Sequence, residues 1–375
     1  MSIPLIILGF ILFVGLVVLH ELGHFLVARR NGVEVEEFGI GFPPRAKVLG
    51  KKDGTVYTLN WLPLGGFVKL KGEFDADTEK GTFGAASLWA KVKIMVAGVI
   101  VNTLTAFVLL TILAAVGIPK ILDNQFTVAS DTKVVQREVL IAFVEPDSPA
   151  SKAGIKDQDE LAAIGIPGEP KDFIESADQL PELTKKYAGR EVEIVIRNGE
   201  GARSTNVNLR TNEEVEASKN TDEPKGYLGI IPSEYIVQRS TWSSPVVALG
   251  FMKQITEATF KGLGSMVAGV AQGDAKKASE QVSGIVGIGY IIGKGSALGL
   301  QFILLIIAII SLTLAIMNVL PIPALDGGRL FVTLLFRAIK KPLTQRKEEW
   351  IHGTGFVFLM LLFVLITIVD INRFT

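Results

Sequence analysis

Long apolar runs alternate with charged segments along this chain of 375 residues. Four runs contain no charged residue, and they cover residues 1–19, 94–118, 295–325 and 353–369. Each run is close to, or longer than, the roughly 17–25 residues that an apolar helix needs to cross a bilayer. The pattern therefore predicts a polytopic α-helical membrane protein with four transmembrane helices.

Residues 33–72, between the first two runs, are rich in glycine and partly alternate between apolar and polar side chains. The stretches 33–42, 55–61 and 65–70 are typical of short strands, and a turn is expected at 50–55. Two interpretations stay open. The strands form a hairpin that covers the helix ends, or they present a sheet edge at the membrane that pairs with an extended peptide.

A small α/β domain is expected at about residues 130–212. It combines strand-like stretches, a helical stretch around 172–187 and a hairpin over 190–210 in which alternate residues are apolar. The polar residues 211–225 are typical of a linker. Residues 242–294 contain helical stretches interrupted by charges, which predicts amphipathic helices on the outer membrane surface or helices packed against the small domain.

The distribution of charge says more than its total. The formal net charge is zero, which gives no support to a nucleic-acid partner. Lysine and arginine concentrate after the first run, before the second and after the third. The positive-inside rule places these segments in the cytoplasm, and both termini and residues 119–294 outside. Cysteine is absent, so disulfide and thiolate chemistry are excluded.

His20, Glu21 and His24 lie at the end of the first apolar run. Inserting one ionisable side chain at the centre of a membrane helix costs roughly 2.5–3.5 kcal/mol of free energy. The two histidines are four residues apart and share one helix face, so both imidazoles can bind one Zn²⁺ with the glutamate beside the metal. The alternative is a polar trio that hydrogen-bonds between helices. Because two of the three histidines in the chain fall in this pattern, we expect zinc.

Zinc needs a third protein ligand and an open fourth position. His352, the remaining histidine, stands alone before the fourth run and is expected at the membrane interface. Asp326 is the only acidic residue between Glu280 and Glu348, and it lies at the predicted cytoplasmic end of the third run. We expect Asp326 to complete the site; a helix cap at the turn is the alternative.

Two amides lie inside the apolar runs. Asn318 precedes Asp326 by eight residues in the third run, so we expect it near the site. Asn102 lies in the second run. Two roles stay open for it: a hydrogen bond to a neighbouring helix, or a contact to substrate.

These residues together resemble a known family. The segment HELGH at 20–24, paired with NVLPIPALDGG at 318–328, is similar to the metal motifs of the site-2 protease family of intramembrane zinc metalloproteases, and closest to bacterial RseP-type regulated intramembrane proteases. The likeness covers nearly the whole chain. Residues 63–73 resemble the family's membrane-associated β-region, 97–107 its second-span G-x-x-x-N segment, 145–155 and 225–230 parts of its PDZ domain, and 283–289 the stretch before its third span.

The resemblance and the apolar runs together imply a domain order. It runs from transmembrane helix 1 at 1–30 through a cytoplasmic-side β-region at 31–90, transmembrane helix 2 at 91–118, an extracytoplasmic PDZ domain and linker at 119–230, amphipathic surface helices at 231–294, transmembrane helix 3 with the LDGG motif at 295–328, a cytoplasmic segment at 329–352 and transmembrane helix 4 at 353–375. The implied location is the bacterial inner (cytoplasmic) membrane, with the active site near the cytoplasmic side.

The implied activity is zinc-dependent hydrolysis of a peptide bond inside the membrane. His20, His24 and Asp326 are expected to hold Zn²⁺, and Glu21 is expected to act as general base. The substrates would be single-span membrane proteins, such as anti-sigma factors or signal-peptide remnants. Contacts to substrate are expected from Asn102, Asn318 and the sheet-edge residues Gly65, Gly66 and Phe67. The PDZ domain would exclude bulky ectodomains or bind a peptide C-terminus.

Other classes of protein account for fewer of these features. A membrane di-iron oxidase needs more histidines than this chain has. A membrane metal carrier uses the three ligands but has no need of Glu21. A catalytically inactive PDZ-bearing scaffold needs only the spans and the external domain.

Overall fold

The computed structural model describes residues 2–198, 201–221, 223–274 and 284–374. The chain divides into two compact units. Residues 1–113 and 244–375 form one, called here the helical unit, and residues 114–243 form the other, called the inserted unit. The family-like stretch 283–289 begins outside the described residues.

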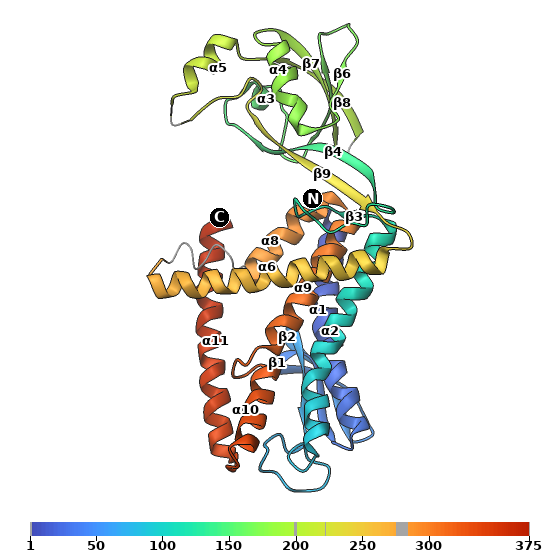
Figure 1. Cartoon of the computed structure of the whole chain (residues 1–375), viewed down its shortest axis with the longest axis vertical. Coiled ribbons are helices and arrows are strands. Elements are labelled where there is room, and N and C mark those ends of the chain that lie inside the picture. The colour runs from blue at the N-terminus through green and yellow to red at the C-terminus, as the bar shows by residue number, and fades with distance from the viewer. Residues whose placement is uncertain (1, 199–200, 222, 275–283, 375) are drawn as a thin grey trace. The chain divides into compact units, whose positions relative to one another are not determined.

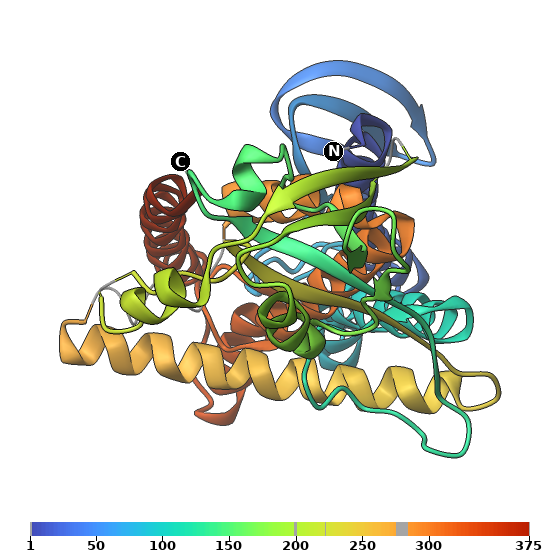
Figure 2. The same cartoon turned by 90° about the horizontal axis from the view of Figure 1, so that it is seen from above.

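Four helices among the described residues are long and apolar enough to cross a membrane, which confirms the predicted number of apolar helices. They are α1 (Ile3–Arg30), α2 (Leu88–Val116), α9 (Leu300–Val319) and α11 (Gln345–Phe374). The helical unit also contains α6 (Ser244–Gln272), α8 (Ile285–Gly295) and α10 (Asp326–Ala338). Helix α6 lies across the long helices (Figure 1). In Figure 2, α6 is seen along its whole length whereas α11 is seen nearly end-on.

The third and fourth spans differ from the expected bounds of 295–328 and 353–375. Helix α9 ends at Val319, because Pro321 and Pro323 cannot continue it. Asp326 is the first residue of the separate helix α10 rather than the end of a span. The expected cytoplasmic segment 329–352 therefore holds the rest of α10 and the first turns of α11.

The β-region consists of two long strands, β1 (Val35–Lys52) and β2 (Thr55–Leu70), where three short strands were expected. The turn between them is at the predicted place, and Asp53 and Gly54 both have positive φ, as a two-residue hairpin turn requires. The first half of β1 pairs on both sides, since Phe38 lies opposite Tyr57 and also opposite Val68. Residues 66–70 consequently form one edge of the sheet.

The inserted unit is built on one sheet with the strand order β3-β9-β4-β5-β7-β8, and β6 pairs with β5. Its core is formed by alternate apolar residues of these strands, such as Ile141, Leu161 and Ile194. The elements are β3 (Ile118–Pro119), β4 (Lys133–Val144), α3 (Pro149–Lys152), β5 (Glu160–Gly165), β6 (Asp172–Phe173), η1 (Ala177–Gln179), α4 (Leu180–Lys186), β7 (Glu191–Asn198), β8 (Gly201–Asn208), α5 (Asn212–Ser218) and β9 (Ile230–Arg239).

Two expectations for this part of the chain were wrong. The expected linker contains helix α5, which begins with a capping box between Thr211 and Glu214. Residues 231–239, expected in a surface helix, form strand β9 instead and pair along the full length of β4. Both assignments depended on local polarity, whereas the cap and the long-range pairing decide the structure.

Asp131 closes the end of the inserted unit. Its carboxylate accepts hydrogen bonds from the backbone N–H groups and the hydroxyl groups of Thr241 and Ser243. Burial by itself raises the pKa of Asp131, but these four hydrogen bonds outweigh it and hold the pKa well below its ordinary value. The ionised carboxylate therefore stabilises the folded state.

We predict that Asp131→Ala lowers the melting temperature of the full-length protein in detergent at pH 7. Because the folded pKa lies below the unfolded value of about 4, the stabilisation is fully present above that pH and is lost as the pH falls. The difference from wild type should therefore shrink below about pH 4. Asp123→Ala removes an equal charge from an exposed position and serves as control. Equal melting temperatures for the two variants at pH 7 would contradict the assignment.

Candidate metal centre

Helices α1 and α10 bring three metal-binding side chains together. His20 and His24 of α1 are 7% and 9% exposed, and Asp326 begins α10. Asp326 Oδ2 lies 3.2 Å from His20 Nε2 and 3.2 Å from His24 Nε2. The two Nε2 atoms are also 3.2 Å apart. Among the described residues, this is the one group of three or more such side chains that could hold a metal ion.

The triangle of donor atoms fits zinc. A tetrahedral Zn²⁺ with ligand bonds of about 2.0–2.2 Å separates neighbouring donors by roughly 3.3 Å. Three such donors occupy three of its four coordination positions and leave the fourth open. His24 Nδ1 lies 2.7 Å from the carbonyl oxygen of Ile94, so the ring donates there and directs the Nε2 lone pair at Asp326. Asp326 Oδ2 is buried and accepts no hydrogen bond within the described part of the chain. Such a set of donor atoms fits a cation held between them.

Glycines explain how α2 packs against the imidazoles. A Cβ atom at Gly98 would lie under 3.0 Å from atoms of both His20 and His24. A Cβ atom at Gly23, on α1, would lie 2.9 Å from Val101 and 3.0 Å from the Ala97 carbonyl oxygen. Sequence reasoning did not assign Gly98 to the site. Its spacing of four residues from Asn102 was the available signal.

The segment between α9 and α10 places Asp326. A Cβ atom at Gly327 would lie under 3.0 Å from the backbone of Val319 and Leu320. A Cβ atom at Gly328 would meet the backbone of Ile322 as closely. The glycine pair therefore lets residues 319–323 fold against the first turn of α10. This fold-back turns the Asp326 carboxylate toward α1.

A small cavity of about 120 Å³ lies beside the three ligands. Glu21, His24, Val68, Asp326 and Arg329 are among the residues that line it. The predicted glutamate thus faces the same space as two of the predicted ligands, His24 and Asp326, whereas His20 is not among the lining residues. The lining residues do not include Asn102 or Asn318.

The predicted sheet edge passes next to Glu21. A Cβ atom at Gly66 would lie 3.4 Å from Glu21 Cγ, which places the edge strand alongside the glutamate. Gly65 and Phe67 flank Gly66, and the Phe67 ring covers Gly39 of β1. Of the two predicted amides, Asn102 is 1% exposed and its side chain has no partner within the described part of the chain, and Asn318 is half-buried near the end of α9.

The fold and the site define a membrane metalloprotein with a buried histidine–histidine–aspartate centre. Residues 8–362 match the profile described as "Peptidase family M50". The chain is 32% identical over 369 residues to "Putative zinc metalloprotease CPE1693" of Clostridium perfringens, with 98% of each chain covered. It is 28% identical to "Zinc metalloprotease RasP" of Geobacillus kaustophilus and 26% identical to "Regulator of sigma-W protease RasP" of Bacillus subtilis, with 97% and 98% of each chain covered.

The chain belongs to peptidase family M50, the site-2 protease family. It is a zinc metalloprotease, which confirms the family, the enzyme class and the metal that the sequence predicted.

We predict that Gly98→Ala lowers the amount of zinc that the purified protein retains. The added methyl group cannot fit against the two imidazoles and must displace at least one of them from Asp326. A loss of roughly ten- to a hundredfold in zinc affinity is expected, as for other disturbances next to metal ligands. Gly15→Ala, on α1 with open space around the new methyl group, is the matched control. Equal zinc affinity in the two variants would show that α2 does not press on the histidines.

Proposed function

We propose that this chain is an intramembrane protease in which His20, His24 and Asp326 hold Zn²⁺ and Glu21 is the general base. The observation that carries the proposal is the triangle of three buried donor atoms with sides of 3.2 Å. Zinc bound there would act as a Lewis acid on the carbonyl oxygen of the scissile peptide bond. The remaining chemistry falls to the side chains of the chain itself.

Glu21 is positioned to move a proton. It lies on the same helix as both histidines and lines the same cavity as Asp326. A carboxylate at this place takes the proton of the attacking water and then delivers it to the leaving amine. A metal carrier or an inactive scaffold gains nothing from a carboxylate in this cavity, so the presence of Glu21 favours the protease.

The edge strand 66–70 would hold the substrate in an extended form. Lys71 N–H donates to the Glu34 carbonyl of the segment next to β1, whereas Leu70 N–H points the other way and donates to the Glu73 side chain. Because successive residues of a strand alternate, the N–H groups of Gly66 and Val68 also point outward, and that of Val68 donates to the Glu21 carboxylate. These donors lie on the side of Glu21, where an unwound substrate helix would need new hydrogen-bond partners.

The inserted unit is proposed to be an extracytoplasmic PDZ domain. Its support is a mainly antiparallel sheet with short helices and the loop at 226–229, whose Leu228 and Gly229 carbonyls bond to the 145–150 segment. We propose that it excludes bulky ectodomains or binds a peptide C-terminus. The basic segments support placing the metal centre near the cytoplasmic face of a bacterial inner membrane.

The proposed substrates are single-span membrane proteins. The Bacillus subtilis relative is named a regulator of sigma-W protease, which supports anti-sigma-factor-like substrates as the first to test. Signal-peptide remnants are a second group with the same single-helix chemistry. Asn102 and Asn318 stay predicted substrate contacts, and for the buried Asn102 such a contact requires the helices around it to separate.

We predict that Glu21→Gln retains zinc but cleaves a single-span reporter roughly 10²- to 10⁴-fold more slowly in detergent, since general acid–base catalysis contributes about that much. Zinc content by elemental analysis and cleavage by gel are measured on the same sample. Glu257→Gln, on the exposed face of α6, is the control for loss of a carboxylate. Full activity of Glu21→Gln would remove the general base from the proposal.

We predict that Val68→Pro lowers kcat/KM by roughly two- to tenfold, the worth of one hydrogen bond. Proline removes the outward N–H group, which bonds to Glu21 in the free protein and would be offered to a paired substrate, and proline is tolerated at a sheet edge whose donor faces away from its partner strand. Val68→Ala keeps the donor and trims the side chain, so it separates the two effects. The edge would have no role in holding substrate if both variants cleaved equally well with equal zinc content.

A further inference from the structure

One face of α11 contacts the segment that carries Asp326. Glu348, His352 and Gly355 occupy positions i, i+4 and i+7 of this helix, so they lie on the same side. Each of the three meets a residue between Pro323 and Arg329. Helix α11 therefore touches the chain on both sides of Asp326.

His352 supports the turn before Asp326. Its Nδ1 atom accepts a hydrogen bond of 3.2 Å from the Ala324 N–H group. Ala324 has φ +77°, a left-handed conformation that a residue with a Cβ atom rarely adopts. Since Nδ1 is the acceptor, the neutral ring carries its proton on Nε2. The bond ties a strained residue of the turn to α11.

Gly355 brings the backbone of α11 against the same turn. A Cβ atom at Gly355 would lie under 3.0 Å from Pro323, including its backbone. Gly353, on another side of the helix, has open space around it. The close approach is therefore specific to the face that also carries His352.

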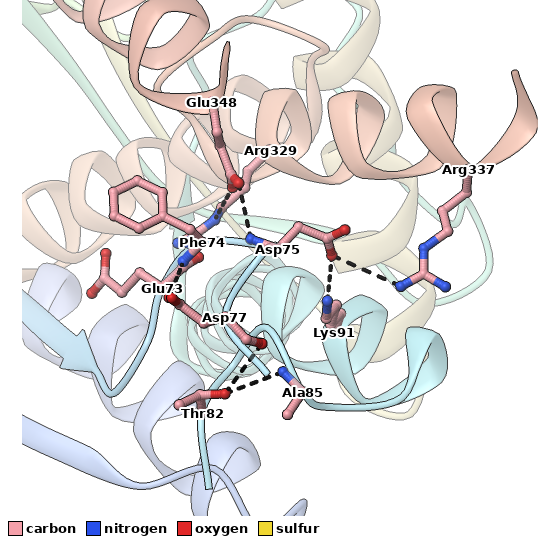
Figure 3. Close-up of polar contacts among 10 residues, drawn as sticks. All are labelled: Glu73, Phe74, Asp75, Asp77, Thr82, Ala85, Lys91, Arg329, Arg337 and Glu348. Atoms are coloured by element: carbon pink, nitrogen blue, oxygen red, sulfur yellow. Dashed lines mark hydrogen bonds and ion pairs between the residues drawn. The ribbon is translucent and has the colours of Figure 1, made fainter. Parts of the chain in front are cut away.

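Glu348 supports the chain after Asp326. This glutamate is 2% exposed, and its Oε1 atom lies 3.8 Å from Arg329 Nε, one turn past Asp326. Its Oε2 atom accepts a hydrogen bond of 2.9 Å from the Asp75 N–H group. Arg329 in turn donates to the Glu73 carbonyl, and Asp75 pairs with the buried Lys91 of α2 (Figure 3). The network joins α11, α10, α2 and the segment after the edge strand.

The apolar part of α11 makes few contacts within the described part of the chain, since only 6% of its residues are buried. Its outer end is held at Asp370, which accepts hydrogen bonds of 2.8 Å from the N–H groups of Gly284 and Gly287. Packing along the middle of α11 thus cannot explain the polar groups at its inner end. Those groups converge on one segment, 323–329.

We infer that the inner end of α11 is a positioning element for Asp326, and that His352 and Glu348 are positioning residues for the proposed reaction. The inference depends on the proposed role of Asp326 as a zinc ligand. Residues 320–325 form no regular structure that would hold the carboxylate by itself. Helix α11 supplies the missing support from a part of the chain that does not touch the metal. Loss of this support should loosen the site without removing a ligand.

The test measures zinc release to a chelating dye and, on the same samples, kcat and KM for a single-span reporter. His352→Leu in the full-length, zinc-loaded protein should release zinc roughly ten- to a hundredfold faster than wild type, in the range found for groups that orient metal ligands. His352→Asn places its amide oxygen where Nδ1 stood, can accept the Ala324 N–H bond again and should recover most of the loss. In both, kcat should change more than KM, because the substitution would act on a proposed zinc ligand and leaves the proposed substrate-binding edge 66–70 unchanged.

Further variants keep the test decisive if His352→Leu does not fold. Gly355→Ala displaces the same turn without removing a polar group and should also speed zinc release. Thr354→Val and Glu349→Gln are matched controls, since Thr354 bonds only to carbonyls of its own helix and Glu349 bonds to Gln345. The inference alone is overturned if wild type holds zinc and cleaves while Gly355→Ala, and His352→Leu where it folds, release zinc at the control rate. A wild type that holds no zinc overturns the proposed function and the inference with it.

Discussion

The structure depends on three buried acceptor atoms that stand 3.2 Å from one another. Two imidazole lone pairs and a carboxylate oxygen repel each other at that distance, and removing the carboxylate ion from water costs several kcal/mol in addition. A divalent cation between them reverses the sign of the interaction. The position of Asp326, the proposed third ligand, then matters most, because His20 and His24 are set by a single helix whereas Asp326 comes from a distant segment.

Small residues make this geometry accessible. Gly98 lets α2 lie against both imidazoles, Gly23 lets α1 approach α2, and the pair Gly327–Gly328 lets the chain fold back beside Asp326. In a bilayer, helices gain little from burying apolar surface against each other, so close backbone approach is a main source of association. The same glycines that pack the helices therefore also shape the metal centre.

The polar groups on the inner side of the helical unit form a second layer around the centre. The edge strand 66–70 lies along Glu21, and the chain that follows it bonds to Arg329 and Glu348. A substrate that pairs with this strand would thus contact a segment that is hydrogen-bonded to α10, the helix that begins with Asp326. In the proposed mechanism, substrate positioning and ligand positioning would therefore share the same set of buried contacts.

The sequence by itself determined the parts of this protein that depend on local pattern. The four apolar helices follow from run length, the hairpin turn from Asp53–Gly54, and the proposal of His20, His24 and Asp326 as metal ligands from the rarity of ionisable residues in apolar runs. Only the tertiary structure decided that Asp326 begins a new helix, that 231–239 is a strand, and that α11 supports the turn at Ala324. These features arise from contacts between residues far apart in the chain, and such contacts leave no periodicity in the sequence near either partner.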